Sequence, residues 1–299
     1  MFGPALLHSV SYSGSWGQAA LSLDQFIDKA ADLGFGGVML MAKRPHLSPL
    51  DFDEAARRKL RAHLEARKLG TVVLAGYTNF TADLEHGEIP QREMQILYVE
   101  ELARLARDIG ASAVRIFTGY DHPSSNYSAQ WNMIVAALKE CSLRAARYGV
   151  TLGVQNHHDM AVGHQTLLDL MLAVQEPNCK PLFDAWAPAL HGDDLYAAAK
   201  LFGGAAPHTT VADYRLRPRY RYNPALVNYE EQMAWSQAVP MGEGFIDYRA
   251  FLSGLVAGGF TGSVAYEMCS PLLHGGSMET LDLYARRFLA YIEEFKSSR

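Results

Sequence analysis

The sequence predicts a single-domain (β/α)₈ barrel, and three observations support this fold class. Eight short apolar runs alternate with eight amphipathic stretches of helical periodicity along the 299 residues, a pattern typical of parallel βα units. No Pro- or Ser-rich linker and no internal repeat divides the chain. Polar donor residues recur in the strand-like runs of the second half, as expected of a barrel whose active site lies at the C-terminal ends of its strands.

Each strand-like run precedes a helical stretch in strict order. The expected strands span residues 5–10, 36–41, 71–76, 113–119, 150–155, 180–184, 206–213 and 263–267. The expected helices span residues 22–34, 53–70, 90–110, 128–149, 163–175, 192–204, 247–259 and 277–295. Ser22 favours a helix N-cap, Gly34 a helix end and Pro90 a helix start, so local signals agree with the periodicity.

Residues 214–246 form a connection that is longer than a barrel loop needs. It contains Trp235 and a basic cluster, residues 215–222, with four arginines interleaved with tyrosines. A lid or a subunit contact is the functional interpretation, and an insertion without a task is the alternative. Arg215 is a candidate contact for an anionic or aromatic substrate, although the cluster also fits a solvated loop.

Composition narrows the class of protein. The chain is 49% hydrophobic and 20% charged, which is typical of a globular domain with a full core. A net charge of −5 argues against a nucleic-acid partner. Three cysteines without a CxxC pair fit a reducing cytoplasm. No apolar run reaches about 18 residues and no signal peptide is evident, so neither a membrane span nor secretion is expected.

Four strand-like runs of the second half are each expected to end on a metal-ligand type. These residues are Gln155, Asp184, His208 and Glu267. Each alone is better explained as a helix cap or a core residue, but four donors on neighbouring parallel strands can converge on one ion. Carboxylate, amide and imidazole donors favour Mn²⁺, Mg²⁺, Co²⁺ or Zn²⁺, and the mixed set with a single histidine favours Mn²⁺.

Two histidines follow the fifth strand directly. His157 and His158 come after Gln155, and the loop there can turn either imidazole toward the site. Histidine titrates near neutral pH and can act as a general base. His158 is the preferred catalytic base, His157 the second choice, and two hydrogen-bonded rim residues without a catalytic role the alternative.

Further polar residues are expected on the same rim. Lys43, Arg44 and His46 follow the second strand and His8 ends the first, so all four are candidate substrate contacts. The glycines of residues 240–248 precede a helix. They either let backbone N–H groups approach a ligand or form a plain helix-entry turn.

At these residues the chain resembles the xylose isomerase-like barrel superfamily, which includes sugar epimerases, inosose dehydratases and endonuclease IV. The epimerases' Glu–Asp–His–Glu metal quartet corresponds to Gln155, Asp184, His208 and Glu267, and residues 240–248 resemble the family's G-x-G-x-I-D segment. The resemblance covers nearly the whole chain. It departs at Gln155, which cannot act as a base, and at Ala187, where the epimerases have a histidine.

The resemblance implies a metal-dependent isomerase or epimerase. It would abstract a proton beside the carbonyl of a sugar or keto-sugar through a metal-stabilised enediolate, with Glu267 and a histidine moving protons. A histidine base beside Gln155 also resembles the large subunits of C-glycoside deglycosidases, lyases that cleave 3-keto C-glycosides and work with a small β subunit. The partners are then a sugar or glycoside, with a homo-oligomer or a β subunit as further possibilities.

Three other functions are less favoured by the sequence. An endonuclease IV-like enzyme would need more histidines and a basic groove. A glycosidase would use Asp184 and Glu267 as its carboxylate pair and leave His208 without a role. A non-catalytic carbohydrate-binding barrel would explain Gln155, but it would not explain the three remaining donors.

Overall fold

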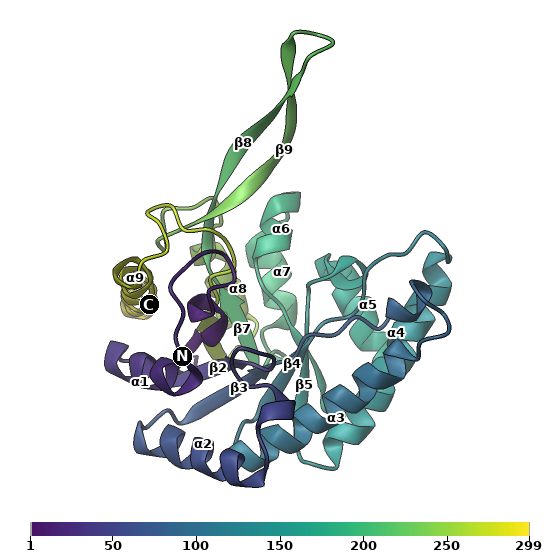
Figure 1. The fold of residues 1–299 in the computed structure, drawn as a ribbon, viewed down its shortest axis with the longest axis vertical. Coiled ribbons are helices and arrows are strands. Elements are labelled where there is room, and N and C mark those ends of the chain that lie inside the picture. The colour runs from purple at the N-terminus through teal and green to yellow at the C-terminus, as the bar shows by residue number, and fades with distance from the viewer. Residues whose placement is uncertain (1, 299) are drawn as a thin grey trace.

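The computed structural model describes residues 2–298 and forms an α/β barrel, as predicted (Figure 1). Its eight barrel strands are β1 (Ala5–His8), β2 (Gly37–Met41), β3 (Thr71–Ala75), β4 (Ala113–Ile116), β5 (Thr151–Gln155), β6 (Cys179–Leu182), β7 (His208–Val211) and β10 (Ser263–Tyr266). Every predicted strand is present, with ends within three residues of the expected ones. The fold class and the number of βα units are therefore confirmed.

All neighbouring barrel strands pair in parallel, in the order β6-β5-β4-β3-β2-β1-β10-β7. Among the described residues no backbone pairing joins β6 to β7, so the barrel is nearly but not fully closed. A side chain bridges this seam, because the Thr209 hydroxyl donates a hydrogen bond of 2.6 Å to the carbonyl of Phe183. The parallel arrangement brings the C-terminal ends of all eight strands to one rim.

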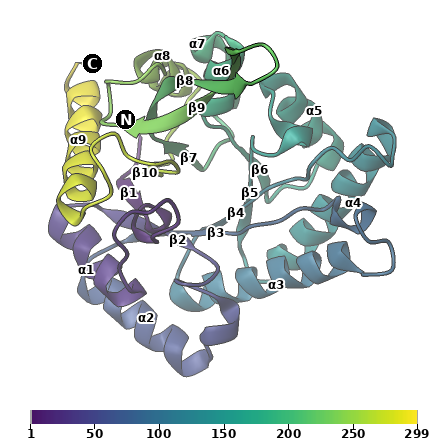
Figure 2. The same cartoon turned by 45° about the horizontal axis from the view of Figure 1, so that its top comes forward.

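Helices form a ring around the strands (Figure 2). They are α1 (Leu23–Leu33), α2 (Glu54–Ala66), α3 (Gln91–Ile109), α4 (Tyr127–Ala146), α5 (His164–Val174), α6 (Trp186–His191), α7 (Leu195–Phe202), α8 (Tyr248–Ala257) and α9 (Met278–Ser297). The predicted caps are present: Ser22 and Gln25 form a capping box on α1, and Gly34 ends that helix at φ 94°. Only the six-residue α6 was not predicted. No helix among residues 2–298 is long and apolar enough to cross a membrane.

The strands bury side chains on both faces. Outward-facing residues such as Val38 and Leu40 of β2 join the large apolar core between strands and helices. The alternate residues fill the barrel interior with a smaller cluster, made up of Leu6, Met39, Val73, Ala75, Ala113 and Ala265. This apolar layer closes the barrel below, so polar side chains at the rim line a cavity with a floor.

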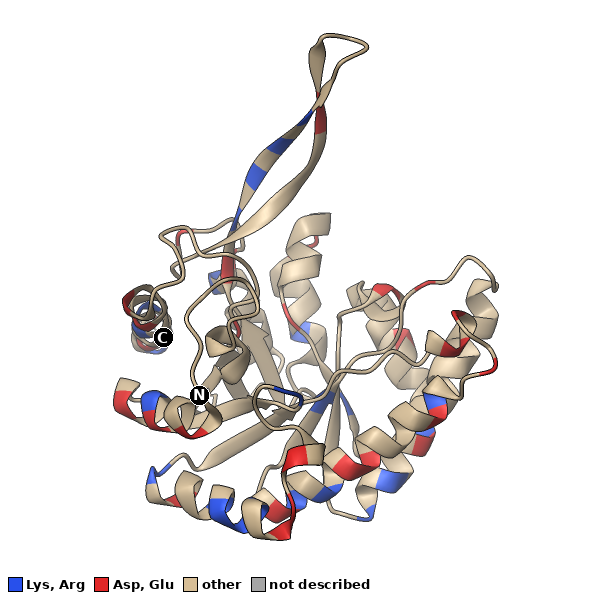
Figure 3. Ribbon diagram, viewed as in Figure 1, with Lys and Arg blue, Asp and Glu red and all other residues tan. Residues whose placement is uncertain are grey.

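The long connection is a β-hairpin that projects away from the barrel (Figure 1). It is made of β8 (Asp213–Asn223) and β9 (Asn228–Val239), paired antiparallel with an irregularity between Arg217 and Arg219. Large apolar side chains are exposed along it, namely Leu216, Tyr220, Tyr222, Leu226, Val227, Tyr229, Met233 and Trp235. Arginines colour one of its strands blue in Figure 3. The hairpin therefore reaches out from the rim, and only its base lies beside the barrel mouth.

Asp213 anchors the base of this hairpin. Its carboxylate accepts hydrogen bonds of 2.9 Å from the backbone N–H groups of Gly242 and Gly244. A Cβ atom at Gly244 would lie 1.9 Å from the Asp213 carboxylate, so only glycine fits there. The glycine N–H groups predicted either to meet a ligand or to form a turn thus bind a carboxylate of the chain itself.

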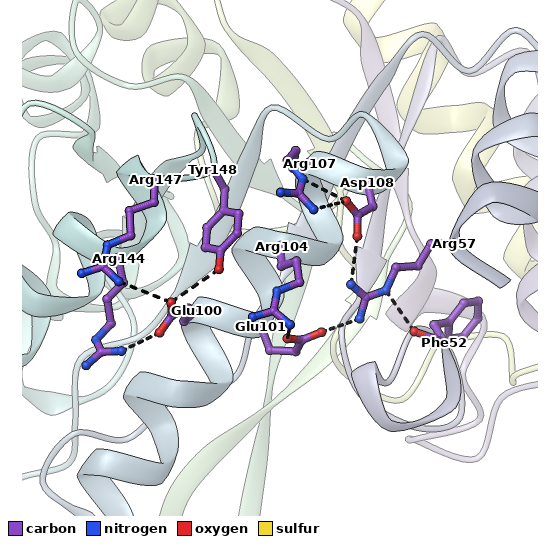
Figure 4. A network of polar contacts seen from close by, with 10 residues as sticks. All are labelled: Phe52, Arg57, Glu100, Glu101, Arg104, Arg107, Asp108, Arg144, Arg147 and Tyr148. Atoms are coloured by element: carbon purple, nitrogen blue, oxygen red, sulfur yellow. Dashed lines mark hydrogen bonds and ion pairs between the residues drawn. The ribbon is translucent and has the colours of Figure 1, made fainter. Parts of the chain in front are cut away.

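A polar network ties α2, α3 and α4 together on the outside of the barrel (Figure 4). Arg57 lies at its centre with only 8% of its side chain exposed. Its guanidinium pairs with Glu101 and, at 2.9 Å, with Asp108, and it donates to the carbonyl of Phe52 at 2.9 Å. A second part of the network joins Glu100 to Arg144 at 2.5 Å. These contacts connect α2 to α3 and α3 to α4.

Replacing Arg57 by methionine is expected to lower the free energy of unfolding by about 1–3 kcal/mol, because Glu101 and Asp108 each lose the more buried of their two arginine partners. Urea denaturation of both proteins would measure the difference. Arg58→Met is the matched control: Arg58 is 72% exposed and lies 3.7 Å from Glu54, so its loss should cost no more than about 0.5 kcal/mol. Equal losses in both variants would contradict a special role for Arg57.

Candidate functional site

A cavity of about 340 Å³ lies at the C-terminal rim, between the barrel mouth and the base of the hairpin. Its lining comes from loops and strand ends all around the barrel: Val10, Ser15, Trp16, Lys43, Tyr77, Arg115, Phe117, Gln155, His157, Asp184, Trp186, Thr210, Val211, Ala212, Tyr214, Tyr248, Glu267 and Cys269. Titratable side chains line the polar parts of the cavity, and aromatic side chains line its apolar parts. This is the position at which barrels of this class carry their active sites.

One wall of the cavity is acidic. Gln155 ends β5, and its amide nitrogen donates hydrogen bonds to the Asp184 carboxylate and, at 3.1 Å, to the Thr210 hydroxyl. Burial raises the pKa of Asp184 to about 6, against the opposing effect of the Gln155 hydrogen bond, and the charge of Glu267 adds to the rise. The carbonyl oxygen of Gln155 is buried and has no partner among the described residues. It can therefore accept a hydrogen bond from a ligand.

Glu267 directly follows β10 and is held by two side chains from other strands. Its Oε1 lies 3.4 Å from Nε2 of His8 and 3.6 Å from a guanidinium nitrogen of Arg115. The Nδ1 atom of His8 accepts a hydrogen bond from the N–H of Val10, so the neutral ring carries its proton on Nε2, toward Glu267. Burial raises the pKa of Glu267, and the charge of Arg115 opposes this rise. A carboxylate so poised is suited to accept a proton near neutral pH.

The two histidines after β5 occupy different surroundings. His157 lines the cavity, whereas His158 lies outside it, stacked on Tyr120 with ring centroids 4.1 Å apart. Phe117 contacts both rings, at 4.5 Å and 4.7 Å between centroids. The backbone at His158 has a positive φ of 60°, a strained conformation for a residue other than glycine, and the two imidazole rings there point to different surroundings. The geometry thus favours His157 over His158, the residue preferred from the sequence.

The tautomer of His157 decides what it can do. Its Nδ1 accepts a hydrogen bond of 2.9 Å from the N–H of His158, so the proton of the neutral ring resides on Nε2. Desolvation by the surrounding cavity walls and then the charge of Arg115 lower the pKa of His157 to about 4, which favours the neutral ring at physiological pH. In this tautomer His157 presents a hydrogen-bond donor to a ligand, whereas the role of second-choice base predicted from the sequence needs a free lone pair.

The opposite wall is cationic. Arg115 of β4 is fully buried, and its guanidinium lies 4.1 Å from the ring centroid of Phe117 and 5.1 Å from that of Tyr77. Lys43 is exposed at the mouth, with its ammonium 4.0 Å from the centroid of the same Tyr77 ring. Nε and one terminal nitrogen of Arg115 have no hydrogen-bond partner among the described residues. Partial burial and the charge of Arg115 lower the pKa of Lys43.

Of the other candidate substrate contacts, none lines the cavity. Arg44 points outward and pairs with Asp51 at 2.6 Å, and His46 is buried with its ring against Phe26 and its Nε2 3.0 Å from the carbonyl of Leu21. Arg215 is exposed on the hairpin. His8 lies beneath the site and touches Glu267 instead of a ligand. Among the five residues predicted to bind substrate, the structure brings only Lys43 into the cavity.

The metal quartet predicted from the sequence is not assembled. His208 is the first residue of β7, not the last, and it pairs with Ser263, four residues before Glu267. At about 3.3 Å per residue it lies roughly 13 Å deeper along the strand. Its Nδ1 is 2.8 Å from the Ser263 hydroxyl, and its Nε2 is buried without a partner. The residue of β7 that reaches the cavity is Thr210.

The residues present do not fit a divalent cation. Residues 2–298 contain no group of three or more His, Cys, Asp and Glu side chains placed to hold a metal. Gln155 and Thr210 are neutral, and Gln155 offers one free oxygen. Arg115 places a positive charge 3.6 Å from one of the two carboxylates, where it would repel a second cation. Two acids, one of them already paired, are a weak donor set for an ion such as Mn²⁺.

Several residues of the cavity were not predicted. Arg115 could have been found, because a charged residue within the apolar run 113–119 is a signal in itself. Tyr77 and Thr210 could not, because residues of those types are common at strand ends. Trp186 stacks on Tyr214 with centroids 4.2 Å apart, a contact that depends on the unpredicted helix α6 and on the base of the hairpin.

Comparisons with known proteins agree with this architecture. The family model for the xylose isomerase-like TIM barrel matches residues 27–288. An L-ribulose 3-epimerase structure superposes with a TM-score of 0.75 at 16% identity, covering 100% of this chain and 95% of that one. A D-psicose 3-epimerase from Clostridium cellulolyticum H10, determined with D-tagatose, gives 0.72 at 15% identity, with 98% and 99% covered.

A probable 3-DHS dehydratase from Bacillus anthracis gives a TM-score of 0.71 at 15% identity, covering 98% of this chain and 99% of that one. No curated protein matches the sequence. At these identities the structures establish the fold and not the reaction. Since the family model spans most of the chain, the protein belongs to the xylose isomerase-like TIM barrel family.

Proposed function

We propose that the protein is an enzyme that removes a proton from the carbon beside a carbonyl group of a sugar or keto-sugar, as an isomerase or epimerase. The observation that carries this proposal is the pairing, in one cavity, of a buried carboxylate with a neutral imidazole donor. Glu267 and His157 both line that cavity. The structural likeness to sugar 3-epimerases supports the same class of substrate.

Glu267 is the proposed base. Its pKa is raised by burial, so it binds a proton more readily than an exposed glutamate does. His8 and Arg115 hold its Oε1 from below and from the side, which fixes the carboxylate's position. A positioned base of raised pKa is the arrangement that proton abstraction from carbon requires near neutral pH.

His157 is the proposed electrophile. As the base removes the proton, negative charge develops on the substrate's carbonyl oxygen, and the Nε2–H of His157 can donate to it. A neutral imidazole of low pKa suits this task, because it donates a hydrogen bond to the developing oxyanion and keeps its own proton. Reprotonation at carbon completes an isomerase or epimerase cycle, and Asp184 is the acid placed to take part.

The aromatic residues of the cavity suit a carbohydrate. The indole of Trp186 stacks on Tyr214, and its N–H is buried without a partner among the described residues. Trp16 lines another part of the cavity. An indole face packs against the C–H groups of a sugar, while its N–H can donate to a hydroxyl.

A lyase that acts on 3-keto C-glycosides is the second candidate. It needs the same proton abstraction, followed by departure of the β-substituent, and the observation that favours it is the neutral Gln155 beside the acidic wall. An epimerase that moves protons on both faces of the sugar uses two carboxylates, whereas this lyase needs only one of them as a base. A small β subunit remains a prediction of this alternative.

The test of the proposed function is exchange of substrate hydrogen with solvent. The protein would be incubated in D₂O with a panel of ketohexoses, ketopentoses and 3-keto glycosides, and deuterium at carbon would be followed by NMR. Incorporation at a carbon next to the carbonyl is expected with at least one compound. A protein that binds members of the panel and exchanges none of them would refute the proposal.

Removal of metal is expected to leave this activity unchanged, because the cavity carries its own guanidinium and lacks a full donor set. Exchange rate and thermal midpoint would be compared before and after dialysis against EDTA. Mn²⁺ added to the dialysed protein should bind only weakly, with a dissociation constant of about 10⁻⁴ M or more. Stoichiometric Mn²⁺ in the purified protein would instead restore the site predicted from the sequence.

A further inference from the structure

The cationic wall of the cavity has more hydrogen-bond donors than the protein uses. Nε and one terminal nitrogen of Arg115, and the hydroxyl of Tyr77, are buried without a partner among the described residues. Lys43 forms no ion pair with an acid within the same residues, although it lies beside the Tyr77 ring. Unpartnered buried donors on charged groups are costly, so their retention in a cavity points to a ligand.

Like charges are also gathered there. Lys43 and Arg115 both lie over Tyr77, at 4.0 Å and 5.1 Å from its centroid. The nearest acid to Arg115 is Glu267, which contacts its other terminal nitrogen at 3.6 Å. Two cations in a partly desolvated site repel each other unless an anion lies between them.

We infer that the substrate is an acid, a small hydroxy- or keto-carboxylate whose carboxylate group lies between Lys43, Arg115 and the Tyr77 hydroxyl. The planar fork of Arg115 matches a carboxylate, and Lys43 adds a point charge at the mouth. This inference rests on the proposed function, because it names the substrate class of the same cavity.

The position of the two walls supports this assignment. The carboxylate would sit at the cationic wall, which β2, β3 and β4 supply, and the rest of the molecule would extend toward Asp184 and Glu267. The volume of about 340 Å³ accommodates a compound of six or seven carbons. The reacting carbon would then lie beside the base, and Arg115, which also contacts Glu267 at 3.6 Å, would balance the charge of both carboxylates.

The test compares ligands that differ only in charge. D-fructose and 2-keto-D-gluconate share every group except C1, which is an alcohol in the first and a carboxylate in the second, and D-galactose and D-galacturonate differ similarly at C6. Isothermal titration calorimetry at low salt would measure binding to the full-length protein. We expect at least one acid of these pairs to bind about 10-fold or more tightly than its neutral partner.

A matched pair of variants locates the effect. Lys43→Met should weaken acid binding about 10-fold and neutral-sugar binding much less, whereas Arg44→Met should change neither, because Arg44 is engaged by Asp51 outside the cavity. Both positions are exposed, so both variants should fold. Added salt should weaken binding of the acid more than that of the neutral sugar.

Equal affinity for acids and neutral compounds, or an equal effect of the two variants, would overturn the inference. Tighter binding of fructose 1-phosphate than of 2-keto-D-gluconate would assign the same cations to a phosphate instead. The outcomes also separate this inference from the proposed function. If the protein exchanges hydrogen on neutral sugars and shows no preference for acids, only the inference about the substrate's charge is refuted. If it binds acids tightly and exchanges hydrogen in no compound, only the proposed function is refuted.

Discussion

Glu267→Gln is expected to slow solvent deuterium exchange by about 10² to 10⁴-fold while substrate binding is retained. The substitution removes the proton acceptor and keeps the size and shape of the side chain, and a positioned base contributes on this scale. Exchange would be followed by NMR with the best compound of the panel, and binding by calorimetry. Glu243→Gln, at an exposed position outside the cavity, is the control and should behave like the wild type.

The pH dependence gives an independent check on the same residue. Glu267 must be ionised to accept a proton, and burial raises its pKa and that of Asp184, the latter to about 6. The rate should therefore fall as the pH drops through the raised pKa of Glu267, and the two interacting carboxyls should titrate as a pair. An undiminished exchange rate in Glu267→Gln would leave Asp184 as the candidate base.

His157→Ala is expected to lower kcat by about 10² to 10³-fold, the usual cost of removing one donor to a developing oxyanion. Since the donor acts mainly on the transition state, kcat and kcat/KM should fall together. The donor is the neutral ring, whose pKa is about 4, so this contribution should stay constant from pH 5 to 8. His157→Asn, which keeps an N–H group, should recover part of the rate.

His158→Ala is the matched control for this variant, because its ring packs on Phe117 and Tyr120 and does not line the cavity. Its loss should reduce the rate by less than about 10-fold, through looser packing of the loop. If His158→Ala proved the more damaging change, the preference derived from the sequence would be right and the assignment of His157 wrong.

The barrel could be predicted from the sequence because its signals are local. Apolar runs, caps such as Ser22 and stops such as Gly34 each act within a few residues, and they agree with one another along the whole chain. The hairpin was recognised only as a long connection, because its arginines and tyrosines follow no buried pattern. A strand without a covered face lacks the alternation by which strands are recognised.

The site was harder to predict because it depends on depth along each strand. Gln155, Asp184 and Glu267 reach one cavity as expected, but His208 begins its strand where an end was assumed. An error of three or four residues is ordinary when a strand boundary is predicted, but it moves a candidate metal ligand out of the site. The roles of His157 and His158 depend on one backbone hydrogen bond and one positive φ, and neither can be read from residue types.

The hairpin also bears on how proteins of this kind diversify. Its first and last residues, Asp213 and Val239, face each other in the register, so the chain leaves and re-enters the barrel at a single point. Paired residues can be inserted or lost beyond that point without moving any barrel strand. Descendants of this chain can therefore change what the hairpin tip meets while inheriting the same chemistry, so the two parts of the protein are free to evolve at different rates.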